Sequence, residues 1–552
     1  MLHVEGPLLS IDLADRTART EAVDDVLESF IGGRGVATKL AHDRIPFDAD
    51  PLGPENRLYL TTGPLQVSIM SYTGRMNATA VSPLTDGLAS SNAGGFLSRN
   101  VADTGYSGVE LTGAADELVI VHVTDEGVEF EPVPDLAGAL VSEVSEHVQA
   151  TRDLGPDHVA AIGPAGENLV RFASIMTTDT RAFGRGGLGA VLGSKNVKAI
   201  TFAGDSRPDL DIPAVASEVH AKAAQVDHIM KRQGTTSVTD LANSIGSFPS
   251  HYFADVRFDR YESINGDAVE AKKYKRGTCS ACAFACKLPT RDEATGLETE
   301  GPEFETLMAF GGNCEIDDLV HIMQSNERCD ELGMDTISCG NTVAMYLAAN
   351  DAFGDEDRIH QLVEQIAHRE GEGDRLAEGI HRVAADYGVE DWTVKGLSFS
   401  AHDGRTLNGQ GLSFAVANRG ADHMYSTFYA WEYPLVRRDE AFDPTGLEDK
   451  PPAIVEQENR RALEDAGVVC RFSRGIMTVE RYEALFGADD ETLLSVGDRI
   501  VTLERHFNNQ RGFDRSDDRL PYELPGFETA LDEYYAVRGW TEDGTVPDEA
   551  VA

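Results

Sequence analysis

The sequence predicts an α+β fold, with a β-rich N-terminal domain followed by mainly helical structure. Up to Asp205, short apolar or alternating runs are separated by glycine, proline, asparagine and aspartate, as is typical of strands joined by tight turns. After Asp205, apolar residues recur at helical spacing in segments that mostly begin with acidic residues. The chain of 552 residues is long enough for two to four domains of ordinary size.

Eight segments show these patterns clearly. Residues 8–13, 57–62, 109–112 and 118–123 have the composition of strands and are bounded by turn-forming residues. Residues 211–232, 317–332, 358–370 and 374–387 have the 3.6-residue spacing of amphipathic helices. The helix ending near position 332 is followed by Gly333, a typical helix-terminating residue.

The charge of the chain is strongly one-sided. It contains 93 acidic and 48 basic residues, a net charge of −45, so nucleic acids and anionic membranes are poor partners. Hydrophobic residues make up 41% of the chain, which indicates a folded protein. An acid-coated surface suits a cytoplasm at very high salt, where the Debye length falls to ~3 Å, and we expect halophilic adaptation. Without a leader or a long apolar stretch, we expect a cytoplasmic protein.

A short run of cysteines indicates a metal cluster. Cys279, Cys282 and Cys286 have C-x2-C-x3-C spacing, which can bind three corners of a cuboidal iron–sulfur cluster, and we expect Cys470 to be the fourth ligand. Structural zinc is the alternative, but zinc sites usually combine two short knuckles and this sequence has one. The remaining cysteines lie in apolar helical segments and are expected to pack in the core: Cys314, Cys329 and Cys339.

Three loops of the first domain combine arginine with small residues. They are residues 32–35, residues 73–77 together with 90–95, and residues 181–189. Such loops let backbone N–H groups approach a phosphate that guanidinium groups also bind. The glycines at 184, 186 and 189 match a dinucleotide fingerprint, but no acidic residue ~20 positions later completes it. Each loop alone is weak evidence, because glycine also serves tight turns. Together they indicate a larger, multiply phosphorylated cofactor.

Two predicted helix ends have similar sequences. Asp330 and Asp335 surround one end, and Asp465 stands at another, followed by a glycine, two apolar residues and Cys470. The helix macrodipole disfavours acids at a C-terminus by ~0.3–1 kcal/mol each, so we expect a compensating partner. A carboxylate can accept two parallel N–H bonds from the amino-pyrimidine edge of a pterin, as it does from arginine. Two such ends indicate two pterins; ordinary exposed acids are the alternative.

Taken together, the motifs resemble those of the aldehyde ferredoxin oxidoreductase family, along nearly the whole chain. They are GGRG from position 32, TGR from 73, NAGG from 92, RAFGRGGLGAVLGSK from 181, C-x2-C-x3-C from 279, GPEFE from 301, DELGMD from 330, RGADH from 419, D-x4-C from 465, DDRLP from 517 and YYAVRGW from 534.

The resemblance implies an architecture and a set of cofactors. A β-rich domain, residues 1–205, would support a tungsten or molybdenum bis-pyranopterin. Two mainly helical domains would cover it: residues 206–400 with the C-x2-C-x3-C and D-x2-G-x-D motifs, and residues 401–552 with His423 and the last cysteine. One [4Fe–4S] cluster would lie beside the pterin. A stand-alone enzyme of this kind is expected to be a homo-oligomer.

Transferred residue by residue, the resemblance implies two sets of cofactor-binding residues. The set at the pterin phosphates and their bridging Mg²⁺ would be Arg75, Asn92, Gly94, Gly95, Arg181, Ala182, Gly184 and Arg185. The set holding the pterins would be Asp330, Met334 and Asp335 for one, and Asp465 and Val469 for the other. The family usually has glycine two residues before the last cysteine, where this chain has Val468. Gln324 stands where some members place an iron-binding acid, so no interfacial iron is expected.

The implied reaction is oxidation of an aldehyde to a carboxylic acid, with electrons passing through the cluster to ferredoxin. A bis-dithiolene metal with an oxygen ligand supplies the two-electron acceptor and the nucleophile. We expect Glu305 to deprotonate water and His423 to hydrogen-bond the carbonyl oxygen, with Glu303 as a further candidate that suits a structural role better. The alternatives are a tungstopterin subunit of a complex that reduces an aromatic thioester, and an iron–sulfur electron-transfer protein without substrate chemistry.

A basic run precedes the cluster cysteines. Residues 272–276 read KKYKR and carry four positive charges in an otherwise acidic chain. These cations either offset the negative charge of a thiolate-bound cluster or form a docking surface for an acidic ferredoxin.

Overall fold

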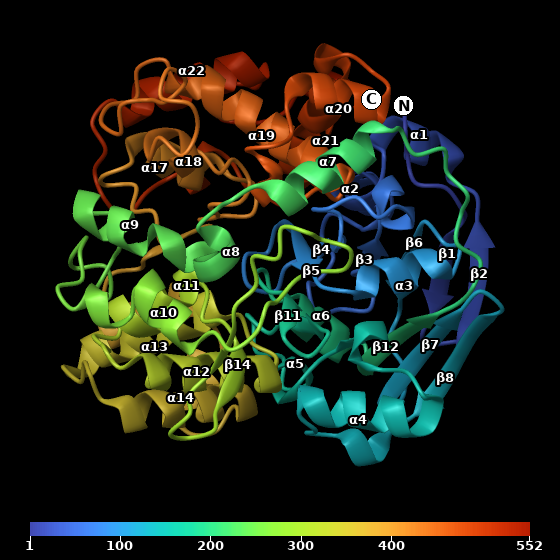
Figure 1. Ribbon diagram of the computed structural model, residues 1–552, viewed down its shortest axis with the longest axis horizontal. Coiled ribbons are helices and arrows are strands. Elements are labelled where there is room, and N and C mark those ends of the chain that lie inside the picture. Colours follow the sequence, from blue (N-terminus) through green and yellow to red (C-terminus); the bar gives the residue numbers. More distant parts are fainter. Residues whose placement is uncertain (552) are drawn as a thin grey trace.

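Two mixed six-stranded sheets form the N-terminal part of the molecule, drawn in blue and teal in Figure 1. The computed structural model describes residues 1–551. The sheets have the strand orders β2-β1-β6-β3-β4-β5 and β11-β10-β9-β12-β7-β8. The strands are β1 (Leu8–Asp12), β2 (Thr17–Glu21), β3 (Leu58–Thr61), β4 (Arg75–Val81), β5 (Leu88–Gly94), β6 (Gly108–Thr112), β7 (Val119–Thr124), β8 (Gly127–Pro132), β9 (Val159–Ala161), β10 (Ile175–Thr177), β11 (Arg181–Phe183) and β12 (Val197–Ala203).

The two sheets share an apolar core. Leu9 and Leu60 from the first sheet pack in one cluster with Val121 and Ile200 from the second. Burial on both faces explains why the central strands are apolar runs rather than strict alternations. The edge strands β5 and β11, one from each sheet, contact each other. Residues 90–94 and 181–183 were expected in loops but belong to these two edge strands, so the candidate segments that contain them are neighbours in space.

Helices flank the sheets and form the rest of the chain. In Figure 1 most of the green-to-yellow helices lie at the left and lower left, beside the strands, and the orange-to-red helices lie at the top, where the green helix α7 contacts α20. They are α1 (Asp24–Phe30), α2 (Gly33–Arg44), α3 (Leu97–Asp103), α4 (Val141–Arg152), α5 (Pro164–Glu167), α6 (Leu188–Ser194), α7 (Val215–Gln225), α8 (Met230–Gln233), α9 (Thr239–Ile245), α10 (Gly266–Lys272), α11 (Phe304–Thr306), α12 (Leu319–Leu332), α13 (Thr336–Asn350), α14 (Glu356–His368), α15 (Glu372–Leu376), α16 (Ile380–Tyr387), α17 (Asn408–Val416), α18 (Tyr429–Glu432), α19 (Lys450–Ala466), α20 (Val479–Phe486), α21 (Asp490–Gln510) and α22 (Phe527–Arg538). Two small hairpins, β13 (Pro289–Arg291) with β14 (Glu298–Glu300) and β15 (Thr393–Val394) with β16 (Leu397–Ser398), lie among these helices.

The predicted fold class is confirmed. All four predicted strands are present within a residue or two at their ends, and the predicted helices at 317–332 and 358–370 correspond to α12 and α14. Two other predicted helices are each divided in the structure. Val226 adopts an extended conformation that ends α7 before α8 begins, and Gly379, at a φ of 84°, separates α15 from α16. The proposed limits of the two helical domains stay a prediction.

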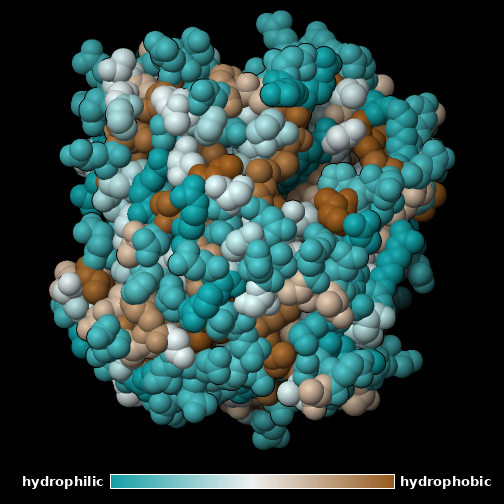
Figure 2. Space-filling model, turned by 60° about the vertical axis from the view of Figure 1, so that its left-hand side comes forward, coloured by the Kyte–Doolittle hydropathy of each residue, from teal (hydrophilic) through white to brown (hydrophobic). Residues whose placement is uncertain are grey.

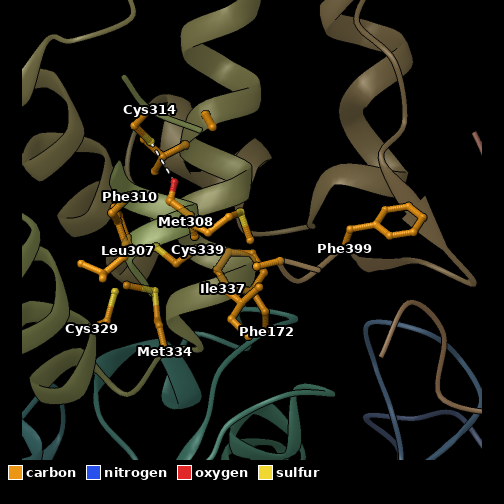
Figure 3. Packing of buried hydrophobic residues seen from close by; sticks show 14 of the residues in the cluster. Phe172, Leu307, Met308, Phe310, Cys314, Cys329, Met334, Ile337, Cys339 and Phe399 are labelled. Carbon is orange, nitrogen blue, oxygen red and sulfur yellow. Dashed lines mark hydrogen bonds between the residues drawn. The ribbon is translucent and has the colours of Figure 1, made fainter. Parts of the chain in front are cut away.

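Three cysteines lie in the largest apolar core, as expected. Figure 3 shows Cys314, Cys329 and Cys339 among methionine, leucine and phenylalanine side chains, and each is 0% exposed. The Sγ of Cys314 donates to the carbonyl oxygen of Ala309. This core also includes Phe172, which follows α5, so it joins the sheet-bearing part to the helices.

The outer surface is mostly polar. The face turned forward in Figure 2 is largely hydrophilic, with hydrophobic side chains gathered in a few places, including the border of a hollow in its upper half. None of the helices within residues 1–551 is both long and apolar enough to cross a membrane.

Candidate active site

A cavity of about 340 Å³ is lined by Glu305, by His423 and by Phe284 of the cysteine run, so three of the candidate segments meet there. This volume lies at the lower end of the range of ~300–1,000 Å³ that is usual for small-molecule pockets. Most of its lining is apolar or aromatic. The lining residues are Tyr72, Val226, His228, Ile229, Met230, Thr235, Ser237, Val238, Leu241, Phe284, Phe304, Glu305, His402, His423, Met424, Tyr429, Leu435, Phe472, Arg474, Gly475 and Ile476.

The carboxylate of Glu305 lies between two imidazoles in this lining. Its Oε1 is 3.4 Å from Nε2 of His423 and 3.5 Å from Nε2 of His402. The backbone N–H of Ala401 donates to the other carboxylate oxygen at 2.7 Å, which fixes the orientation of the group. The structure thus brings Glu305 and His423 together, as the sequence interpretation requires, although they are far apart in the chain.

His402 is a member of this group that sequence reasoning missed. The imidazole is 3% exposed, its Nδ1 is 2.9 Å from the hydroxyl of Tyr433, and its ring stacks on Tyr429 with centroids 3.7 Å apart. Burial, with a contribution from the nearby His423, holds the pKa of His402 well below its usual range. The ring is therefore neutral near pH 7. Its left-handed backbone, φ 68°, is visible only in the structure.

A tight turn positions His423. The carboxylate of Asp422 accepts N–H bonds from Met424 and Tyr425, which closes a turn around the histidine. Arg419 pairs with Asp422 and also donates to the carbonyl oxygen of Ser90 in β5. The RGADH motif therefore fixes the histidine relative to the first sheet. Within residues 1–551, Nδ1 of His423 is buried and has no hydrogen-bond partner.

Glu303 lies outside the cavity lining. Its carboxylate accepts bonds from Lys287, at 3.1 Å, and from the hydroxyl of Thr235. Burial acts to raise the pKa of this carboxyl, but Lys287 and Thr235 hold it below its usual value. These contacts hold Glu303 between Lys287, which follows the cysteine run, and Thr235 of the cavity wall.

The four candidate cluster ligands come from two segments that meet at one strand turn. The amide of Cys470 donates to the carbonyl oxygen of Tyr72 at 2.7 Å, and the amide of Ala283 donates to the hydroxyl of Ser71 at 2.9 Å. Burial raises the pKa of both Cys282 and Cys286, and the neighbouring Cys470 thiol adds to each shift. The cysteine far downstream therefore belongs to the same group as the C-x2-C-x3-C run.

No three of the four candidate cysteine sulfurs all lie within 4.8 Å of one another in the structure. Tetrahedral coordination at ~2.3 Å brings thiolate sulfurs within about 4 Å of one another. Among the described residues, only Asp318, His321 and Glu356 form a group of three metal-ligand side chains with all ligand atoms within 4.8 Å.

Glycines let the cysteine loop lie directly on the β4–β5 hairpin. A Cβ on Gly94 would come within 3.1 Å of the Sγ of Cys279, and a Cβ on Gly74 would come within 2.8 Å of the carbonyl oxygen of Ser280. Arg75, between them, donates to the carbonyl oxygen of Asn92 at 2.9 Å. The arginine and glycine of this loop therefore border the cluster site.

The remaining loop residues meet at the touching edges of the two sheets. A Cβ on Gly95 would come within 3.1 Å of the side chain of Arg181, which forms an ion pair with Glu300 at 3.3 Å. Ala182 pairs with Met176 between β11 and β10. The region around Gly184 is open, since its nearest non-neighbouring atom would be an Asp335 oxygen at 3.9 Å.

Arg185 contacts three segments that lie far downstream in the chain. It donates to the carbonyl oxygens of Ser398 and Ala421, and its Nε is 3.5 Å from the carboxylate of Asp335. This Nε is buried without a hydrogen-bond partner within the described residues, as are the hydroxyls of Thr177 and Thr178. Unpaired buried donors of this kind are what a phosphate would satisfy.

At the C-terminus of α12, only one of the two acids lies where the helix dipole disfavours negative charge. Asp330 lies in the last turn of α12, but Asp335 caps the following helix, α13, by accepting from Ile337 and Ser338. The expectation that both acids oppose a helix dipole is wrong, because Asp335 lies at the favourable N-terminus. Met334 packs into the apolar core (Figure 3), so its side chain is not a polar contact for a cofactor.

At the second helix end, Asp465 is strongly paired. Arg471 contacts it through two nitrogens, at 2.6 and 2.7 Å, Arg34 lies at 3.2 Å, and Asn92 also donates to it. Burial acts to raise the pKa of the Asp465 carboxyl, but Arg471 and Arg34 hold it below its usual value. Val469 is buried, with its amide donating to the carbonyl oxygen of Glu464.

Comparison with known protein families decides between the possible classes. Residues 8–204 match the aldehyde ferredoxin oxidoreductase N-terminal domain, and residues 214–552 match domains 2 and 3 of that family. The chain belongs to the aldehyde ferredoxin oxidoreductase family. It is 34% identical to the tungsten-containing aldehyde ferredoxin oxidoreductase of Pyrococcus furiosus over 99% of this chain and 97% of that protein. It is 33% identical to the Thermococcus kodakarensis enzyme with the same coverage.

Proteins with other names are also similar. An aliphatic sulfonate oxidoreductase WOR-like subunit of Pyrococcus furiosus is 26% identical over the full length of this chain and 96% of its own. The active-site complex BamBC of benzoyl coenzyme A reductase, solved with 1,5-dienoyl-CoA, has a chain of the same fold, with a TM-score of 0.85 at 23% identity, covering 99% and 96% of the two chains. Membership of this family identifies the chain as a tungsten oxidoreductase. Its substrate and its electron acceptor are matters of proposal.

The structure fits the tungsten pterin cofactor that the family implies. The donors left unpaired at Arg185 and the two threonines, and the open space at Gly184, lie around the meeting edges of β5 and β11. The unpaired Nδ1 of His423 lies in the adjoining cavity lining. These features suit an anionic cofactor placed between the first sheet and the cavity.

Proposed function

We propose that the protein oxidises an aldehyde to the carboxylic acid at a tungsten bis-pyranopterin, and that electrons leave through one [4Fe–4S] cluster to ferredoxin. The observation that carries this proposal is the placement of Glu305 between His423 and His402 in the lining of a largely apolar cavity. A carboxylate beside two imidazoles provides proton transfer and hydrogen bonding, and the apolar lining excludes bulk water. Molybdenum is the alternative metal.

The cofactor would supply the two-electron acceptor and the oxygen nucleophile. Its phosphates and their Mg²⁺ would be held by Arg75, Arg181, Arg185 and the small residues beside them. Asp330 and Asp465 would bind the pterin amino groups, each at the end of a helix that faces the first domain. Cys279, Cys282, Cys286 and Cys470 would hold the cluster.

The chain's own groups then divide the proton chemistry. The Glu305 carboxylate, oriented by the Ala401 amide, takes a proton from water. His423 hydrogen-bonds the carbonyl oxygen of the aldehyde and lowers the cost of the charge that develops there. His402, neutral because it is buried, orients the carboxylate from the opposite side.

An exit for electrons lies next to the cavity. Tyr72 and Phe284, which line it, belong to the two segments that carry or contact the cluster cysteines. An open groove of about 570 Å³ is lined by basic side chains from the same region: Lys231, Arg232, Lys273, Lys275 and Arg276. The positive charge of this groove suits the binding of an acidic partner such as ferredoxin. At high salt the partner would be held by direct contact pairs, because long-range electrostatic attraction is screened.

Replacing Glu305 by Gln or His423 by Ala tests the proposed chemistry. Each change should lower aldehyde-dependent viologen reduction by ~10²–10⁴-fold, because a general base or a carbonyl contact is lost. Tungsten and iron contents should stay at wild-type levels in both variants. Glu303→Gln serves as the matched control, with a smaller loss because its carboxylate pairs with Lys287 outside the cavity. Unchanged turnover in the first two variants would refute their roles.

A thioester reductase subunit is the second candidate, favoured by the structural similarity to the BamBC complex. The isolated chain distinguishes the two. If it oxidises aldehydes with viologen, or with ferredoxin, in molar KCl, the first function holds. If turnover requires an aromatic CoA thioester and further subunits, the second does.

A further inference from the structure

A buried row of polar groups runs from Glu305 away from the cavity. Nε2 of His402 is 3.5 Å from Oε1 of Glu305, and Nδ1 of His402 is 2.9 Å from the hydroxyl of Tyr433. That hydroxyl is 2.5 Å from Oγ of Ser247, which follows α9. His402, Tyr433 and Ser247 are 3%, 2% and 0% exposed. The candidate base is therefore backed by three groups that are shielded from bulk water.

Backbone hydrogen bonds hold this row in place. The amide of His402 donates to the carbonyl oxygen of Ser247 at 3.2 Å, and the amide of Tyr433 donates to the carbonyl oxygen of Tyr429 at 2.8 Å. The ring of Tyr429 stacks on the imidazole. Tyr433 and Ser247 lie outside the cavity lining, whereas His402 belongs to it. The two hydroxyls can therefore act on the cavity through His402.

The protons of the row can be counted. Burial raises the pKa of Tyr433 well above its usual value and holds the pKa of His402 well below its own, so both groups are neutral near pH 7. Each hydroxyl and the neutral imidazole then have one proton to donate. In one arrangement Ser247 donates to Tyr433 and Tyr433 donates to Nδ1, which leaves the imidazole proton on Nε2, facing Glu305. In the reverse arrangement Nδ1 donates to Tyr433, Tyr433 donates to Ser247, and Ser247 donates to the carbonyl oxygen of Ala242 at 3.3 Å.

The charge on Glu305 decides between the two arrangements. An ionised carboxylate only accepts hydrogen bonds, so the reverse arrangement would turn a bare Nε2 toward it, lone pair to lone pair. The first arrangement gives the carboxylate a donor at a buried place, where a charge-assisted bond is strong. The 3.5 Å contact is long, but catalytic hydrogen bonds commonly shorten when a substrate is bound. Which imidazole nitrogen carries the proton is thus set by the bond that Tyr433 makes to the other one.

We propose that Tyr433 is a positioning residue for the reaction: its hydroxyl, supported by Ser247, keeps the proton of His402 on Nε2, where it stabilises the charged form of Glu305. This inference rests on the proposed function, in which Glu305 takes a proton from water. A hydrogen bond to the charged form of a carboxyl favours that form, so the base stays available at lower pH.

Other ionisable groups also face the row. They are His423 and Arg185 near Glu305, Arg474 near His402, and Tyr429 and Asp403 near Tyr433. All of them are retained in the variants described below. A difference between a variant and the wild type therefore reports on the altered group of the row.

The pH profile of turnover tests the direction of the row. Tyr433→Phe removes one buried oxygen and keeps the ring. The imidazole then loses the donor that fixes its proton, so the acid limb of kcat/KM should move to higher pH by ~0.5–1 unit, a ~3–10-fold loss on that limb. Ser247→Ala should move the limb in the same direction by a smaller amount. Aldehyde-dependent viologen reduction measures both variants, and turnover on the plateau should stay within about threefold of wild type.

The reverse arrangement predicts the opposite sign. In that case, removing either hydroxyl would let the imidazole proton move to Nε2, and the acid limb would move to lower pH. A shift to lower pH in either variant, or an unmoved limb in Tyr433→Phe, would overturn the proposal. Tyr252→Phe is the matched control, because its hydroxyl donates to the carbonyl oxygen of Glu390 at 2.7 Å, away from the cavity lining. Its pH profile should equal that of the wild type.

A double variant separates positioning from a general structural role. If Tyr433 acts through His402, Tyr433→Phe should have no further effect on the pH profile of His402→Ala. An equal shift in both backgrounds would show that Tyr433 acts independently and would overturn the proposal. Tungsten and iron contents establish that each variant is loaded. If Tyr433→Phe does not fold, the sign of the Ser247→Ala shift decides.

Glu305→Gln distinguishes this proposal from the proposed function. Its low residual turnover should lack the acid limb. A limb retained in Glu305→Gln would refute Glu305 as the base, and the role of Tyr433 would fall with it. A limb that is lost in Glu305→Gln but does not move in Tyr433→Phe would refute the positioning role alone.

Discussion

The two helix ends that face the first domain have similar sequences and different surroundings. At the end of α12, Asp330 is followed by Gly333 and Asp335; at the end of α19, Asp465 is followed by Gly467 and Cys470. The residue five positions after the acid is Asp335, a helix cap, at the first end. At the second end it is Cys470, a candidate cluster ligand. The same spacing therefore positions two residues with unrelated roles.

The two acids also differ in charge balance. Asp465 is held by Arg471, Arg34 and Asn92, and its pKa is below the usual value despite burial. Burial instead raises the pKa of Asp330 well above its usual value. Arg181 opposes this shift, and Glu327, Glu331 and Glu300 add to it. A pterin amino group at Asp330 would supply a missing donor. At Asp465 a pterin amino group would have to replace one of the bonds that Arg471, Arg34 and Asn92 already donate.

The first test of this comparison concerns the fifth position. Cys470→Ala should abolish the four-iron form of the cluster, detected as loss of iron and of the visible and paramagnetic signals, because one thiolate corner is removed. Asp335→Ala should retain the cluster and lower the free energy of unfolding by ~1–3 kcal/mol, because it removes the α13 cap and the carboxylate beside Arg185, as read from denaturant unfolding.

Cys339→Ala is the matched cysteine control, because this residue is buried in the apolar core. It should retain all four irons. An intact cluster in Cys470→Ala would remove the distinction between the two helix ends.

The second test compares the acids themselves. Asp465→Asn should lower the free energy of unfolding by ~3–5 kcal/mol, because it leaves Arg471 buried without its partner. Asp330→Asn should be close to neutral in protein without cofactor, since this carboxyl is disfavoured in its charged form. Chemical unfolding of both variants with wild type measures the difference.

The pH dependence of stability should also distinguish Asp465 from Asp330. Because the folded pKa of Asp465 is lowered, its contribution is present above the unfolded value of ~3.9 and is lost as pH falls through the folded pKa. The folded pKa of Asp330 is raised, so stability decreases as pH rises from ~4 toward that value. Asp330→Asn should remove this decrease and Asp465→Asn should remove the acid-side loss. Equal profiles for the two variants would contradict the comparison.

The fold and the local motifs could be predicted because they depend on short-range patterns. The apolar runs of β3 and β7, the spacing of α12, and the short cysteine run all express their structure within a few residues. The charge state of Asp465 could not be predicted, since Arg34 and Asn92 are hundreds of residues away and meet it only in the fold. His402 was missed for the same reason: its partners Glu305 and Tyr433 come from other segments.

The smallest expected effect concerns the backbone at the two helix ends. Gly333 has a φ of 75°, and a Cβ there would lie 2.7 Å from the amide nitrogen of Gly163, so Gly333→Ala should cost ~2–3 kcal/mol from strain and overpacking. At the second end Gly467 is right-handed, and the left-handed residue is Val468, at φ 53°. This is the position at which the resemblance leads us to expect glycine.

Val468→Gly therefore relieves ~1–2 kcal/mol of backbone strain but removes a 1% exposed apolar side chain worth ~1.5–3 kcal/mol, with a further entropic cost of ~0.5–1 kcal/mol. The net change should be a loss of about 1 kcal/mol or slightly more. Val468→Ala is the control, because it loses packing and keeps most of the strain, and it should be no more stable than Val468→Gly. If Val468→Ala proved clearly the more stable of the two, strain would not be what distinguishes the second helix end from the first.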